Sequence, residues 1–169
     1  MEKQTDHTEV NPIYKKDDIC KLLDRYGVEY EIHNDPSDGD YNYLQEGSLC
    51  ITVINTTSEY PLYIDLEDMG EFTLTYYRWH CHYTPEECSY DEMITDLKNI
   101  LNNNICLMII YSKARWLSSS LSQTDAGRDH DYKTDLKRLP AEFRKEIKKT
   151  KGKMELVYWD TSKNITIDL

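Results

Sequence analysis

Hydrophobic residues recur at helical spacing near the beginning of the chain. The pattern predicts a helix over residues 17–26, in which Asp17 or Asp18 caps the start and Gly27 ends the helix in the left-handed conformation. The apolar face of this helix is formed by Ile19, Leu22, Leu23 and Tyr26. Apolar and polar residues then alternate over residues 28–33, which is typical of a half-buried strand.

Three further strands are predicted in the middle of the chain, over residues 49–53, 62–66 and 72–76, because apolar side chains alternate along each of them. The segments between these strands are short and rich in turn-forming residues. Consecutive strands with short connections form an antiparallel meander. The segment 34–47 contains Asp, Pro, Ser and Gly together, and this composition predicts an acidic loop.

The clearest helical pattern begins at Ser89, which forms a capping box with Glu92, and continues to Leu101. The next run, residues 105–111, is apolar on both faces. A strand tolerates this composition only inside a covered sheet, so the run is predicted to be a central strand. Residues 115–121 are expected to pair beside it.

The last part of the chain predicts a helix and a hairpin. Residues 122–132 are polar and are interpreted as a loop. Apolar residues at helical spacing then indicate a helix over residues 139–151, which Gly152 closes. Two final strands, over residues 154–159 and 164–169, flank a turn of polar residues.

Together these elements predict an α+β fold, with a mostly antiparallel twisted sheet of about six to eight strands and two or three helices packed on it. The first twelve residues lack periodicity and are expected to be a disordered tail, so that residues 13–169 form a single domain. No apolar run approaches the roughly 20 residues that span a bilayer. The amino terminus is polar where a signal peptide would be apolar. Neither a membrane partner nor export is expected.

The cysteines and charges refine this picture. The five cysteines are an odd number without a CxxC spacing, which favours buried thiols in a reducing, cytoplasmic compartment. Residues 1–100 contain 7 Lys and Arg against 22 Asp and Glu, a net charge of −15, whereas residues 133–153 contain 9 against 3, a net charge of +6. Most of the chain would repel nucleic acid, so none is expected as a partner.

Candidate catalytic chemistry is sparse. His80 and His82 would point to one side of a strand, and two imidazoles so placed can begin a metal site, although a third ligand is needed. Glu86, Glu87 and Cys88 are near in sequence. The alternative is that both histidines form hydrogen bonds or face solvent at a strand end. No nucleophile elbow or phosphate-binding glycine loop is present, so we assign no catalytic residue and expect no cofactor.

The order of elements over residues 72–121 adds a resemblance. A strand ends in Trp79-His80-Cys81-His82-Tyr83, a linker with two glutamates and a helix follow, and a buried strand leads to Arg115-Trp116-Leu117-Ser118-Ser119. This order is similar to that of small bacterial proteins found among the immunity proteins of polymorphic toxin systems. The resemblance implies a compact acidic inhibitor that binds one cognate toxin, commonly a basic nuclease. No site residue of this chain is assigned from the resemblance.

The resulting hypothesis is an immunity-type inhibitor that is a monomer or a weak homodimer and binds its toxin through acidic loops and tyrosines. The chain has 14 tyrosines, and four of them are interleaved with acidic residues: Tyr41, Tyr43, Tyr60 and Tyr63. The predicted partner-binding residues are Asp35, Asp38, Asp40, Tyr41, Tyr43, Glu67, Asp68, Glu71, Glu86 and Glu87. Two alternatives stay open: a metal-dependent enzyme that uses His80 and His82, and a non-catalytic adaptor or assembly protein.

Overall fold

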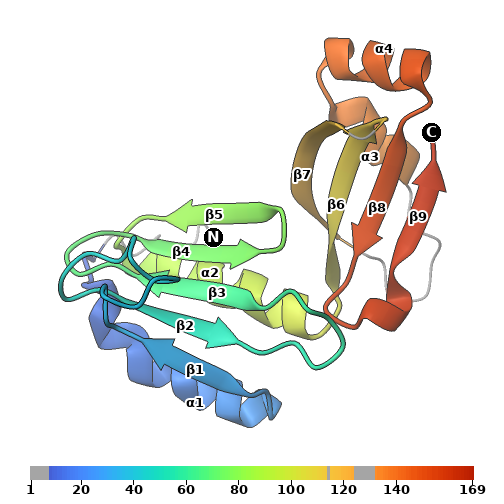
Figure 1. Cartoon of the computed structure of the whole chain (residues 1–169). Coiled ribbons are helices and arrows are strands. Elements are labelled where there is room, and N and C mark those ends of the chain that lie inside the picture. Colours follow the sequence, from blue (N-terminus) through green and yellow to red (C-terminus); the bar gives the residue numbers. More distant parts are fainter. Residues whose placement is uncertain (1–7, 114, 124–131) are drawn as a thin grey trace, which may run out of the picture. The chain divides into compact units, whose positions relative to one another are not determined.

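The computed structural model describes residues 8–113, 115–123 and 132–169. Contacts between residues cluster into two compact units, residues 1–98 and 99–169, and each is described by itself. The described residues form two antiparallel sheets together with α-helices (Figure 1). The predicted α+β class is therefore confirmed.

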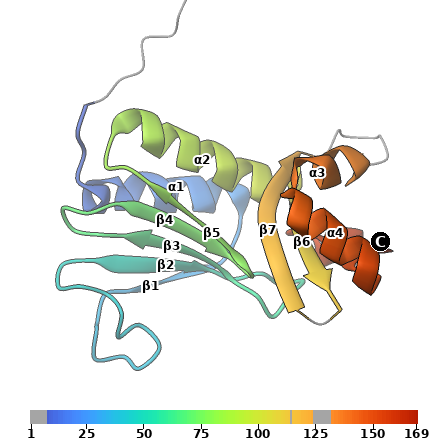
Figure 2. The same cartoon turned by 90° about the horizontal axis from the view of Figure 1, so that it is seen from above.

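The first unit contains a five-stranded sheet in the order β1-β2-β3-β4-β5. Its strands are β1 (Tyr30–His33), β2 (Leu49–Val53), β3 (Leu62–Leu66), β4 (Phe72–Tyr76) and β5 (Trp79–Tyr83). Each strand pairs antiparallel with the next one along the chain, so the predicted meander is confirmed. Helices α1 (Lys16–Tyr26) and α2 (Glu87–Leu101) lie on one face of this sheet (Figure 2).

Alternation along the strands separates the two faces of this sheet. On β3, Leu62, Ile64 and Leu66 are fully buried, whereas Tyr63 and Asp65 between them are only partly buried. The apolar positions of β2 and β4 are in register with those of β3. Leu23 of α1 and Leu97 of α2 are also fully buried, on the helices that cover one face of the sheet (Figure 2). The core of the unit therefore lies between the sheet and the two helices.

The helix ends differ partly from expectation. Gly27 ends α1 in the left-handed conformation, with φ of 63°, as predicted. The start is not capped by an aspartate: a 3-10 turn over Pro12–Lys15 precedes the helix, and the side chain of Asn11 accepts a hydrogen bond from the Ile13 amide.

Helix α2 begins at Glu87, two residues before the predicted start. The Ser89 hydroxyl lies 2.7 Å from the Thr84 hydroxyl, so its hydrogen bond is made with Thr84.

Part of the predicted disordered tail is ordered. The Glu87 amide donates to the Thr8 carbonyl at 3.0 Å, and the Val10 amide donates to the Pro85 carbonyl at 2.9 Å. These bonds hold residues 8–12 against the segment that leads into α2, because they satisfy backbone groups that an isolated tail would leave to water. Residues 1–7 of the predicted tail lie outside the described residues.

The second unit contains a four-stranded sheet in the order β7-β6-β8-β9. Its strands are β6 (Ile105–Ser112), β7 (Arg115–Gln123), β8 (Lys153–Val157) and β9 (Ile165–Asp168), and its helices are α3 (Tyr132–Arg138) and α4 (Ala141–Thr150). Strand β6 is buried along its whole length between β7 and β8, which confirms the predicted central strand. Its side chains Cys106, Met108 and Ile110 pack with Ile147 of α4 and with Met154 and Leu156 of β8.

The nine described strands form two sheets, not the single sheet of six to eight strands that the pattern predicts. Each sheet uses strands from one contiguous stretch of chain, because neighbouring strands pair most readily with one another. Strand β7 and helix α3 also occupy both ends of the predicted loop 122–132, of which residues 124–131 lie outside the description. The single domain predicted for residues 13–169 stays a prediction.

Gly152 offers a test of packing in the second unit. A Cβ atom at this position would lie 2.7 Å from the Tyr111 carbonyl oxygen and 2.8 Å from Cγ2 of Ile147. We expect Gly152→Ala to lower the free energy of unfolding by about 1–3 kcal/mol, because overpacking forces the backbone to shift. Urea unfolding measures the change. The control is Gly39→Ala, where nothing lies within 4 Å of the added atom; equal effects of both variants would contradict the expectation.

Candidate functional site

The face of the five-stranded sheet that the helices do not cover carries polar side chains. Their backbone positions are paired across β2, β3, β4 and β5, so they belong to the same side of the sheet. We call this surface the open face, and it is formed by Cys50, Thr52, Tyr63, Asp65, Thr73, Thr75, His80 and His82.

The segment between β1 and β2, residues 34–48, folds on the side of the open face (Figure 2). We call it the connecting loop. Successive turns shape it: the Tyr41 amide donates to the Asp38 carbonyl at 2.9 Å, and the Leu44 amide donates to the Tyr41 carbonyl at 3.0 Å. Leu44 is only 7% exposed and anchors the loop by burying its side chain.

Two tyrosines attach the connecting loop to the strands below. The Tyr41 ring stacks on His33 with 3.8 Å between ring centroids, and its hydroxyl lies 3.0 Å from that of Thr52. The Tyr43 hydroxyl donates to Oδ1 of Asp65 at 2.9 Å. The loop is thus held to β1, β2 and β3 through contacts that leave part of each ring available.

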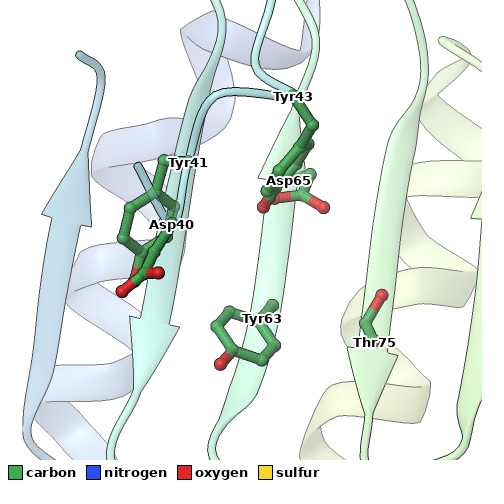
Figure 3. Close-up of a pocket in the computed structure, with 6 residues that line it drawn as sticks. All are labelled: Asp40, Tyr41, Tyr43, Tyr63, Asp65 and Thr75. Carbon is green, nitrogen blue, oxygen red and sulfur yellow. The ribbon is translucent and has the colours of Figure 1, made fainter. Parts of the chain in front are cut away.

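A pocket of about 480 Å³ lies between the connecting loop and the open face, within the usual range for small-molecule or side-chain binding. Figure 3 shows the rings and carboxylates arranged around it, with contributions from the loop, from β3 and from β4. We call it the tyrosine pocket, and it is lined by Asp40, Tyr41, Tyr43, Tyr63, Asp65 and Thr75.

Asp65 lies in an environment of the tyrosine pocket that disfavours its charged form. Burial raises the pKa of its carboxyl group, and hydrogen bonds from Cys50 and Tyr43 offset this only in part. Among the described residues, no positively charged group contributes to the shift. Buried carboxylates in proteins are usually paired with a cation or with a metal ion. The pocket therefore contains a carboxylate whose electrostatic partner is not supplied by the described part of this chain.

The phenols around Asp65 stay protonated at neutral pH. Burial is the largest cause that raises the pKa of Tyr41, Tyr43 and Tyr63 above its ordinary value. Their rings therefore provide neutral aromatic surfaces, whose negative π-faces attract cations. Aromatic rings and carboxylates in one hollow favour recognition of a positively charged group.

Only part of the predicted partner-binding set lies in this pocket. Asp40, Tyr41 and Tyr43 line it. Asp35 and Asp38 are exposed in the same connecting loop, and each carboxylate accepts a backbone hydrogen bond two residues ahead. Their role in binding a partner stays a prediction.

The remaining predicted acidic residues lie in other places and contact their own surroundings. Oδ1 of Asp68 accepts from the Asn11 side chain at 2.7 Å, and Oε2 of Glu67 accepts from the Glu71 amide at 3.4 Å. Glu87 forms an ion pair with Lys15 at 2.7 Å. Glu86 forms a backbone bridge with Glu9. The structure therefore does not gather all ten predicted residues into one patch.

Three pocket residues are additional to the predicted set: Tyr63, Asp65 and Thr75. A signal for Asp65 exists in the sequence, because aspartate is disfavoured in β-strands even at the polar positions of an alternating pattern. Tyr63, noted for its acidic neighbours, is also in the pocket. Tyr60 is not; its ring contacts Tyr77 at 4.2 Å.

His80 and His82 lie side by side on β5, with 5.2 Å between their ring centroids. Nδ1 of His82 is 2.6 Å from Oε1 of Glu71 and 3.1 Å from the Thr73 hydroxyl. Throughout the described ranges, no group of three or more His, Cys, Asp and Glu side chains is placed to hold a metal ion. The third ligand that the sequence hypothesis requires is thus not found in this part of the chain.

Wider comparisons give no independent guide to the site. Searches against protein-family models, curated proteins and solved structures found no match. Among the helices that the structure describes, none is long and apolar enough to cross a membrane. The site is therefore interpreted from the geometry of its own residues.

A chemical labelling experiment can test whether the connecting loop shields β2 from solvent. Cys50 is fully buried under the loop, and burial is the chief cause that raises the pKa of its thiol to about 12 from the ordinary 9.0. At about pH 8 we expect iodoacetamide to modify Cys50 roughly 100-fold or more slowly in the native protein than in urea, because little thiolate is present. Peptide mapping by mass spectrometry measures both rates. Native labelling at the unfolded rate would contradict this cover.

Proposed function

We propose that this protein is an immunity-type inhibitor, which binds and neutralises a cognate bacterial toxin through the open face and the connecting loop. The observation that carries the proposal is the Asp65 carboxylate, partly buried among three tyrosines with no cationic partner in the described part of the chain. A positively charged group of another protein would complete this site.

The charge of the first unit supports a basic partner such as a nuclease. Residues 1–98 contain 7 Lys and Arg against 22 Asp and Glu, which gives a net charge of −15. A surface of this sign accelerates the encounter with a positively charged protein and selects against acidic ones. The carboxylates would pair with the lysines and arginines of the toxin, where the phosphates of its nucleic acid substrate would otherwise lie.

Tyrosines would supply much of the affinity. Aromatic residues dominate binding energy in protein interfaces when they occupy a well-packed centre surrounded by polar groups. The tyrosine pocket has this layout, because Tyr63 lies on the open face while exposed Asp35 and Asp38 lie in the connecting loop that borders it. Salt bridges at such a rim contribute little, whereas the pair at Asp65 would lose contact with water on binding.

The expected setting of this inhibitor is the cytoplasm, where it acts as a monomer or a weak homodimer without a membrane partner. None of the five cysteines forms a disulfide. Cysteines without disulfides are the rule in a reducing compartment, which supports this location.

Co-expression with the toxin encoded by the gene immediately upstream tests the proposal. We expect the wild-type protein to restore growth of cells that express the toxic domain, and the two purified proteins to form a complex. Asp65→Asn and Tyr63→Ala should lose protection. Asp17→Asn removes the same charge from an exposed position on α1 and should retain it. Failure of the wild-type protein to bind or neutralise the toxin would show that the proposal is wrong.

A further inference from the structure

We infer that the tyrosine pocket accepts a single alkylammonium group, the side chain of a lysine of the partner, in preference to the guanidinium group of an arginine. This inference rests on the proposed function, because it names the chemical group of the toxin that anchors the complex.

The pocket suits one cationic side chain. Its volume of about 480 Å³ has room for a long basic side chain, and its wall combines three phenol rings with the carboxylates of Asp40 and Asp65 (Figure 3). An alkyl chain can pack against the rings while the charged end reaches the carboxylates, as long basic side chains commonly do on apolar surfaces. The rings also attract the cation through their π-faces.

The hydrogen bonds of Asp65 favour binding of a compact ammonium group over binding of a planar guanidinium group. Its Oδ1 already accepts from the Tyr43 hydroxyl at 2.9 Å, so this oxygen is already engaged. A guanidinium group binds best when both oxygens of a carboxylate are available in its plane. An ammonium group needs no such alignment, because its three donors rotate to whichever acceptors are present.

Further acceptors lie in several directions around the pocket. Asp40 comes from the connecting loop, and Thr75 comes from β4, on the opposite side of Tyr63 from Asp40 and Tyr41 in Figure 3. Three donors directed to separate acceptors match an ammonium group better than a flat group whose donors share one plane. The described residues do not fill this position with a lysine of their own, because only Asp, Tyr and Thr line the pocket.

A titration followed by NMR of the tyrosine rings tests the inference on the full chain. The probes are n-butylammonium, butyltrimethylammonium and n-propylguanidinium chlorides, at constant ionic strength. We expect saturable shifts of the Tyr41, Tyr43 and Tyr63 rings, with n-butylammonium binding about 5-fold or more tightly than n-propylguanidinium. Butyltrimethylammonium should also bind more weakly than n-butylammonium, because it lacks N–H donors. Equal or tighter binding of either alternative, or shifts that do not saturate, would overturn the inference.

Two variants identify the cause of the preference. Asp65→Asn should weaken n-butylammonium about 10-fold or more, while Asp17→Asn should leave it unchanged. Tyr43→Phe keeps the ring but frees Oδ1 of Asp65. This variant should therefore narrow the preference for ammonium over guanidinium. An unchanged preference in Tyr43→Phe, or unchanged affinity in a folded Asp65→Asn, would contradict the assigned geometry.

The outcomes also separate this inference from the inhibitor proposal. If the wild-type protein neutralises the toxin but binds no alkylammonium, the inference of a bound lysine is wrong, whereas the inhibitor proposal is supported. If n-butylammonium binds as expected but the toxin is not neutralised, the pocket recognises ammonium groups and the inhibitor proposal is wrong.

Discussion

Replacement of Asp65 by asparagine is expected to weaken binding of the toxin by a factor of about 100 or more, because a desolvated charge pair loses one member and leaves the other buried without a partner. Isothermal titration calorimetry of the purified complex measures the change. Asp17→Asn is the matched control, since it removes the same charge from an exposed site on α1. If Asp65→Asn binds the toxin with an affinity within a few-fold of the wild type, the binding energy comes from other residues of the protein.

The same substitution should have the opposite effect on the free protein. Burial raises the pKa of Asp65 above its ordinary value of 3.8, so the folded state binds a proton more tightly than the unfolded state. The carboxyl group therefore contributes stability below the unfolded pKa, and this contribution is lost as the pH rises through the folded pKa. Relative to Asp65→Asn, the wild type should be less stable at neutral pH than in acid.

Urea unfolding of the wild type and of Asp65→Asn, from neutral to acid pH, checks the direction of this change in stability. The difference in free energy of unfolding between wild type and Asp65→Asn should move in favour of the wild type as the pH falls toward 3.8. A change in the other direction would mean that the ionised carboxylate is stabilised within the protein. The pocket would then need no cation from a partner.

The second large effect concerns the core of the first unit. Leu74 is fully buried in β4, and its neighbours across the sheet are Ile64 and Cys81. We expect Leu74→Ala to lower the free energy of unfolding by about 2–5 kcal/mol, because it removes apolar contacts and leaves a cavity. Chemical denaturation followed by circular dichroism measures this loss.

The next residue along the same strand supplies the control. Thr75 points to the open face and lines the tyrosine pocket. Thr75→Ala should change stability by less than about 1 kcal/mol, since a partly exposed hydroxyl and methyl are removed. Similar losses for Leu74→Ala and Thr75→Ala would contradict the assignment of the two faces.

Much of the fold of the first unit follows from alternation in the sequence. Leu62, Ile64 and Leu66 alternate with two polar residues, and this pattern correctly places a strand with one buried face. The same reasoning locates β2 and β4, because their side chains also have to satisfy a period of two. Gly27 ends α1 as expected, since only glycine adopts the left-handed conformation without strain.

The tyrosine pocket could not be predicted in this way. It depends on where the connecting loop folds back, and the bond from Tyr43 to Asp65 joins residues 22 positions apart. Turn-forming residues identify a loop but do not determine which strand it covers. Charge patterning likewise shows that Glu71, Asp68 and Glu87 are acidic, but not that each of them contacts a nearby polar or basic group.

Strand pairing could be predicted only between neighbours in the sequence. The expected pairing of residues 115–121 beside β6 is confirmed, but the apolar run of β6 does not tell which strand lies on its other side. The structure pairs β6 with β7 and β8, which gives a second sheet. Pairing is decided by contacts between distant segments, so that periodicity alone leaves several arrangements open.

The central claim is that the open face and the connecting loop form the surface that binds the toxin. NMR chemical-shift mapping of the labelled protein on addition of the unlabelled toxin domain tests this claim most directly. We expect the largest changes at Tyr63 and Asp65 of β3 and at Tyr41 and Tyr43 of the connecting loop. Changes confined to the outer surfaces of α1 and α2, or to the strands and helices of residues 99–169, would contradict it.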